Sequence, residues 1–157
     1  MLKNIVKYLP FILSILVSVN NLNCAAQEIA PLNRELELAC IDGNIIRVRE
    51  LLDQGMDINA KNYFGITALM LACVNNNLEL AKLLLDRGAN INAQNSKGDT
   101  ALTLACRNNN LELATLLLDR GADVNVQDNW GRTALMCAAQ SNSPKMVKLL
   151  FTYNPDW

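Results

Sequence analysis

Apolar and polar positions follow one another in blocks that return along the chain. The apolar block ALMLAC at 68–73 is followed by three Asn residues, by a second apolar block, LELAKLLL at 78–85, and then by Gly88. Apolar residues three and four positions apart in these blocks predict two short amphipathic helices. The Asn run predicts the turn between them, because Asn tolerates the left-handed backbone conformation, and Gly88 is typical of a residue just past a helix end.

This pattern recurs with a period of 33 residues. Gly65, Gly98 and Gly131 are 33 positions apart, and segment 75–88 returns at 108–121 with a single difference. A fixed period of this length is typical of a solenoid built from stacked units. The predicted units are 31–61, 62–94, 95–127 and 128–157. We therefore expect an all-α solenoid of about four helix–turn–helix units with short hairpin loops between them.

The units resemble the ankyrin repeat. The family pattern reads roughly D-x-x-G-x-T-P-L-H-x-A-A and later G-A-D-x-N-A, whereas residues 62–73 read NYFGITALMLAC and residues 88–93 read GANINA. The resemblance covers about residues 31–157 and implies a stack in which neighbouring units bury each other's apolar faces. The chain departs from the family at the His of the T-P-L-H box, which is replaced in three units by Met70, Thr103 and Met136.

The first 26 residues differ from the repeats and are typical of a secretory signal peptide. Lys3 and Lys7 precede an apolar run at 9–19, and the small residues Cys24-Ala25-Ala26 end the segment. This order predicts export and cleavage after Ala26.

Residues 27–30 are then a short linker to the repeats. Two alternatives stay open for the leader. It could remain as an uncleaved anchor, although the apolar run is shorter than the ~20 residues of a membrane span, or Cys24 could be lipidated, as in bacterial lipoproteins. We expect a periplasmic protein, with an outer-membrane lipoprotein or a secreted protein as alternatives.

Composition narrows the function. The chain has 14 Lys and Arg, 15 Asp and Glu, and no His. A net charge of -1 argues against nucleic-acid binding, and the lack of His removes the commonest general base and metal ligand. No nucleotide-binding or catalytic motif is present. We therefore expect a monomeric protein that is not an enzyme and has no cofactor, metal or small-molecule substrate.

Three cysteines occupy the equivalent position in successive repeats. Cys40, Cys73 and Cys106 are 33 positions apart, and Cys137 is displaced from the equivalent position by two. Stacked helices lie ~8–10 Å apart, whereas a disulfide needs Cα atoms within ~7 Å. We expect these thiols to stay reduced and to act as small buried apolar groups.

The resemblance implies that a partner binds the concave face, formed by the hairpin tips and the exposed side of each first helix. The tips carry three aromatic rings, and exposed Tyr and Trp are frequent in binding hot spots. The alternative is that each ring lies flat on its own hairpin. The predicted contact residues are Tyr63, Phe64, Ile66, Val74, Asn75, Ser96, Lys97, Asp99, Arg107, Asn108, Asn129, Trp130, Arg132, Gln140 and Ser141.

Nothing in the sequence indicates a catalytic role for the acidic residues of the hairpins. Asp99 and Asp128 fall on different hairpins, and nothing in the sequence indicates a shifted pKa for either.

We expect a protein or peptide partner in the cell envelope. The alternative is a secreted effector or protective protein directed at host or competitor proteins.

Overall fold

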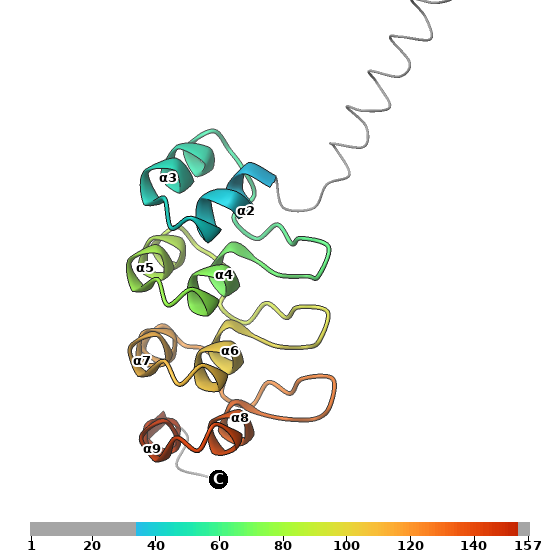
Figure 1. The fold of residues 1–157 in the computed structure, drawn as a ribbon, viewed down its shortest axis with the longest axis vertical. Helices are drawn as coiled ribbons and strands as arrows, with labels where there is room; N and C mark the ends of the chain where they lie inside the picture. Colours follow the sequence, from blue (N-terminus) through green and yellow to red (C-terminus); the bar gives the residue numbers. More distant parts are fainter. Residues whose placement is uncertain (1–33, 154–157) are drawn as a thin grey trace, which may run out of the picture. The chain divides into compact units, whose positions relative to one another are not determined.

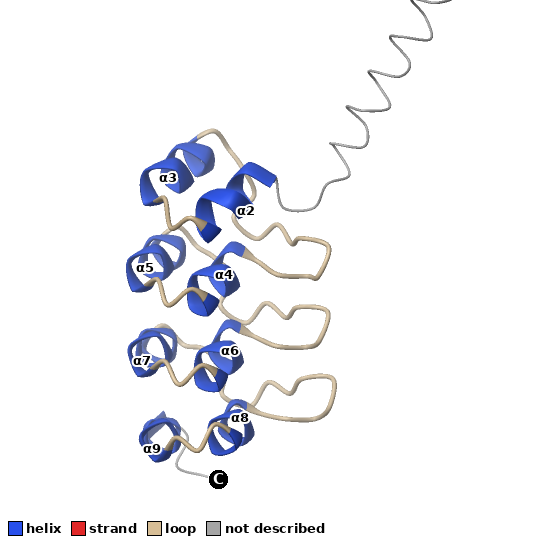
Figure 2. Cartoon of the chain, in the orientation of Figure 1, coloured by secondary structure: helices blue, strands red, loops and turns tan. Residues whose placement is uncertain are grey.

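The computed structural model describes residues 34–153, so the predicted signal peptide, the linker and Cys24 lie outside the described residues. Every regular element within 34–153 is a helix, and the helices come in pairs (Figure 2). The pairs are α2 (Arg34–Ile41) with α3 (Ile45–Asp53), α4 (Ala68–Val74) with α5 (Leu78–Asp86), α6 (Ala101–Arg107) with α7 (Leu111–Asp119), and α8 (Ala134–Gln140) with α9 (Pro144–Tyr153). The predicted all-α solenoid is confirmed. Within the described range, no helix has the length and apolar character to cross a membrane.

The helix pairs stack into two rows (Figure 1). The first helices α2, α4, α6 and α8 form one row, and the second helices α3, α5, α7 and α9 form the other. Three hairpin loops project beside the first helices, away from the row of second helices. We call residues 54–67 the first hairpin, 87–100 the second and 120–133 the third.

Local sequence sets where the helices begin and end. Thr67 caps α4 by accepting a hydrogen bond from the Met70 backbone N–H, and Asn77 caps α5 in the same way. Such caps satisfy backbone donors that have no partner inside the helix. Between the two helices Asn76 has φ 55°, and Gly43 has φ 66° at the equivalent position of the preceding unit. The Asn run therefore makes the predicted left-handed turn.

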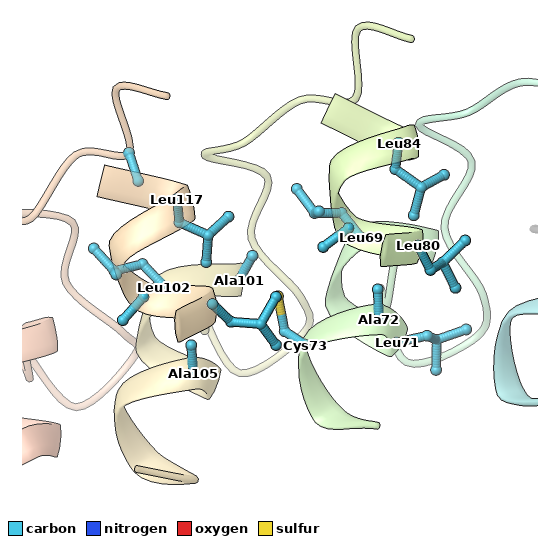
Figure 3. Close-up of a cluster of buried hydrophobic side chains, with 14 of the residues drawn as sticks. Leu69, Leu71, Ala72, Cys73, Leu80, Leu84, Ala101, Leu102, Ala105 and Leu117 are labelled. Atoms are coloured by element: carbon cyan, nitrogen blue, oxygen red, sulfur yellow. The ribbon is translucent and has the colours of Figure 1, made fainter. Parts of the chain in front are cut away.

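Small residues let successive units pack closely. Leu69 and Ala72 of α4 and Leu80 and Leu84 of α5 are at most 1% exposed. Figure 3 shows them in one cluster with residues of the next unit, including Ala105 of α6. Burying each Leu side chain contributes roughly 1.5–3 kcal/mol. Because that burial needs a neighbour, the stack rather than the single unit is the stable structure.

Ion pairs on the second-helix side keep the same period. Arg87 Nη1 lies 2.7 Å from Asp53 Oδ1 of the preceding unit, and Arg120 Nη1 lies 2.8 Å from Asp86 Oδ1. All four side chains are exposed, so each pair contributes only about 0.2–1 kcal/mol. These pairs join neighbouring units but contribute little to the stability of the fold.

The cysteines are buried and free, as the sequence predicts. Cys40, Cys73, Cys106 and Cys137 form no disulfide in the described chain. Burial raises the pKa of the Cys40, Cys73 and Cys106 thiols to about 12. The thiols are therefore protonated and unreactive at neutral pH.

Candidate functional site

Each hairpin tip is shaped by one side chain that binds its own backbone. Asn62 Oδ1 accepts hydrogen bonds of 3.0 Å from the N–H groups of both Phe64 and Ile66. Asn95 and Asp128 do the same in the next two hairpins. The sequence analysis did not predict a role for these three residues. Their pattern is nevertheless visible in the sequence, because an Asn or Asp lies three positions before each tip Gly with the period of 33.

The tips are also tied to one another. The Ser96 N–H donates to the Phe64 carbonyl at 3.0 Å, and the Asn129 N–H donates to the Lys97 carbonyl at 3.0 Å. The approach is close enough that a Cβ on Gly98 would lie 2.7 Å from Asn129 N. The three tips therefore form one preorganised row, because backbone bonds join each to the next.

Three aromatic rings stand out from this row. Tyr63 is 88% exposed, Phe64 66% and Trp130 62%. Tyr63 and Phe64 meet edge to face, with ring centroids 5.9 Å apart, and the Arg132 guanidinium carbon lies 4.9 Å from the Trp130 ring. Each ring contacts a neighbouring side chain and keeps most of its surface exposed to solvent. Large aromatic side chains left this exposed are typical of binding surfaces.

Asp99, one of the predicted contact residues, is almost fully enclosed. Its side chain is only 2% exposed, and Arg107 Nη2 lies 2.6 Å from its Oδ1. The hydrogen bond to Asp99 raises the pKa of Arg107 above its already high value. This ion pair occupies the carboxylate, so Asp99 positions Arg107.

Asp128 pairs with an Arg in the third hairpin as Asp99 does in the second, a role that the sequence analysis did not predict. Its side chain is fully covered, and Arg132 lies 2.7 Å away from its Oδ2. Burial by itself would raise the pKa of Asp128, but the bonds from Arg132 and from the Trp130 N–H prevail and lower it. The buried carboxylate therefore holds Arg132, which in turn lies over the Trp130 ring.

A pocket of about 260 Å³ lies between the first two hairpins and α6. We call it the tip pocket. Six of its eight lining residues belong to the predicted contact set, namely Phe64, Ile66, Ser96, Lys97, Asp99 and Arg107. Asn95 and Leu104 complete the lining and were missed, because only the tertiary structure turns them toward the same space.

The other predicted residues lie outside the tip pocket. Val74, Asn75, Asn108, Asn129, Trp130 and Gln140 are exposed, whereas Arg132 and Ser141 are half-buried. Three of these predicted contacts make side-chain hydrogen bonds to the preceding unit. Asn75 Nδ2 donates to the Ile41 carbonyl at 3.3 Å, Asn129 Nδ2 donates to the Ser96 carbonyl at 3.0 Å, and Ser141 Oγ donates to the Arg107 carbonyl at 3.0 Å. Among residues 34–153, no group of three His, Cys, Asp or Glu side chains is placed to hold a metal ion.

Two family models match this chain. A model described as ankyrin repeats (3 copies) matches residues 88–157, and one described as ankyrin repeats (many copies) matches residues 51–105. Together the matches extend from residue 51 to residue 157, well over half of the chain. No curated protein matches it.

Proposed function

Because this chain belongs to the ankyrin repeat family, we propose that it is a non-enzymatic module that binds one protein partner through its concave face. Ankyrin repeats are in general protein–protein interaction modules. In this proposal the face comprises the tips at 63–64, 96–97 and 129–130 together with the solvent-exposed residues of the first helices, such as Val74 of α4 and Gln140 of α8.

The exposure of Tyr63, Phe64 and Trp130 is the observation that carries this proposal. These three rings lie at hairpin tips, where the stack itself does not need them for its core. Aromatic anchors of this kind carry a large share of the energy of many protein interfaces, about 2–4 kcal/mol each at hot spots.

The scaffold behind the rings supports binding without a large change of shape. Backbone hydrogen bonds join the tips, and in residues 34–153 every buried side-chain N or O atom has a hydrogen-bond partner. A preorganised surface loses little conformational entropy when its partner binds.

We further propose that the protein acts in the periplasm or cell envelope. The leader at 1–26, with its basic start, apolar run and small residues, supports export. A secreted effector or protective protein is the second candidate. Mass spectrometry of the mature N-terminus, together with fractionation of cells and medium, distinguishes cleavage, lipid attachment at Cys24 and release from the cell.

Affinity capture from an envelope extract tests the binding site. The baits are the wild-type chain and a triple variant with Tyr63→Ala, Phe64→Ala and Trp130→Ala. Each substitution should weaken binding by about 1–4 kcal/mol, so the triple variant should lose the partner. The site is wrong if the triple variant, shown by circular dichroism to be folded, retains it.

Ile46→Ala is the matched control for the capture experiment. Ile46 is 75% exposed on α3, in the row of second helices and therefore away from the hairpin tips. The variant removes an exposed apolar side chain from the opposite side, so the captured partner should remain.

A further inference from the structure

We infer that the tip pocket takes one large apolar side chain of the partner, while Lys97 at its rim binds a neighbouring carboxylate of the same segment. This inference rests on the proposed function, and it specifies the partner's chemistry. The segment would be an exposed stretch in which Leu, Ile, Met or Phe lies next to Asp or Glu.

Three of the eight residues that line the tip pocket are apolar. Phe64 and Ile66 come from the first hairpin and Leu104 comes from α6. Ile66 is only partly buried, and Phe64 is mostly exposed, so a guest side chain would cover apolar surface that now faces water. That transfer favours binding by roughly 25 cal/mol per Å² of apolar area covered.

The size of the tip pocket limits the guest. About 260 Å³ is room for one side chain but not for a helix, which is ~10–12 Å across. The Ser96 N–H and the Phe64 carbonyl, which face each other between the first two hairpins, already form a hydrogen bond with each other. A partner strand therefore cannot pair there, and recognition must come from side chains.

Charge at the rim selects a carboxylate. Asp99 and Arg107 neutralise each other at 2.6 Å within the lining. Lys97 is exposed, and no carboxylate of residues 34–153 lies within ion-pair distance of it. The lining thus has one positive charge in excess, on a chain whose net charge is -1. An acidic residue beside the apolar anchor would complement it.

Selection from a phage-displayed library of random peptides tests this inference. Peptides selected on the purified wild-type chain should pair an aliphatic or aromatic residue with an Asp or Glu one or two positions away. Their affinity for each variant is then measured by fluorescence anisotropy with one labelled, selected peptide.

Two variants and a matched control make the test specific. Lys97→Glu reverses the charge at the rim, and Ser96→Trp fills the tip pocket from an exposed position. Each should weaken peptide binding by about tenfold or more. Lys82→Glu makes the same charge change on the exposed side of α5 and should alter affinity by less than about twofold, since long-range charge effects are screened. A peptide with Lys in place of its acid should regain binding to Lys97→Glu.

The inference is overturned if the selected peptides lack the apolar–acidic pair, or if Lys97→Glu and Ser96→Trp bind them as tightly as the wild type. Failure here, with the protein partner still captured through the three rings, removes this inference alone. Failure of the capture experiment as well removes the proposed binding site itself.

Discussion

Arg107 of α6 covers the buried carboxylate of Asp99 on the second hairpin, with Nη2 2.6 Å from Oδ1 and Nη1 3.3 Å from Oδ2. This two-pronged contact joins a loop to the helix that follows it. It explains why a charged residue at a hairpin has no free side chain to offer a partner. Asp128 and Arg132 make the corresponding contact within the third hairpin.

Replacing the buried acid should reveal its structural role. Asp99→Asn keeps the shape of the side chain but removes its charge, so it should lower the free energy of unfolding by about 1.5–3 kcal/mol, the range for hydrogen bonds to charged groups. Urea titration measures the change. Asp86→Asn, which breaks the exposed pair with Arg120, is the control and should cost only about 0.2–1 kcal/mol. Equal losses in the two variants would contradict the role assigned to Asp99.

Asp128 should make stability depend on pH in the acidic range. Its pKa in the folded protein is lowered, so its charged form stabilises the fold above the unfolded pKa of about 3.9, and this contribution is lost as pH falls through the folded value. At neutral pH, Asp128→Asn should therefore be less stable than the wild type. The two free energies of unfolding should approach each other as pH falls below about 4. A difference that stays constant over this range would exclude the effect.

Ala substitutions at two hairpin glycines distinguish the cost of backbone strain from the cost of a steric clash. Gly98 (φ 78°) and Gly131 (φ 74°) share the same left-handed conformation, so an Ala at either position is strained by about 1–2 kcal/mol. A Cβ on Gly98 would also meet Asn129 N at 2.7 Å, whereas one on Gly131 would meet nothing within 4 Å. We expect Gly98→Ala to lose about 1–3 kcal/mol more than Gly131→Ala in calorimetry. Similar melting temperatures would mean that the hairpins are not tightly stacked.

Buried thiols should weaken the fold at alkaline pH. The Cys73 pKa is raised to about 12, so the thiol stays protonated in the folded chain while the unfolded thiol ionises near pH 8.5. The contribution of the Cys73 thiol to the stability of the fold is therefore complete below pH ~8.5 and is lost as pH rises toward 12. When the pH is raised from 8 to 10, the free energy of unfolding should fall in both proteins. The decrease should be smaller in Cys73→Ala than in the wild type, by about 1–2 kcal/mol. Parallel denaturant midpoints for the two proteins would rule this out.

Sequence alone determined the features that depend on near neighbours in the chain. The Thr67 and Asn77 caps and the left-handed Asn76 follow from contacts within a few residues, and the period of 33 residues is visible in the sequence itself. Stacking is implied by the same pattern, because a single helix pair has no second surface on which to bury its Leu and Ala side chains.

Only the tertiary structure decided which tip residues face solvent and which are enclosed. Met70 and Met136 occupy the same column, yet Met70 is 1% exposed and Met136 51%. The burial of Asp99 could not be read from the sequence for a similar reason, since it accompanies the ion pair with Arg107. The tip pocket likewise joins Phe64 to Leu104, which belong to different units. Burial is a property of what lies alongside a residue in space, and a repeat period says where a residue recurs but not how its neighbours in adjacent units fill the space around it.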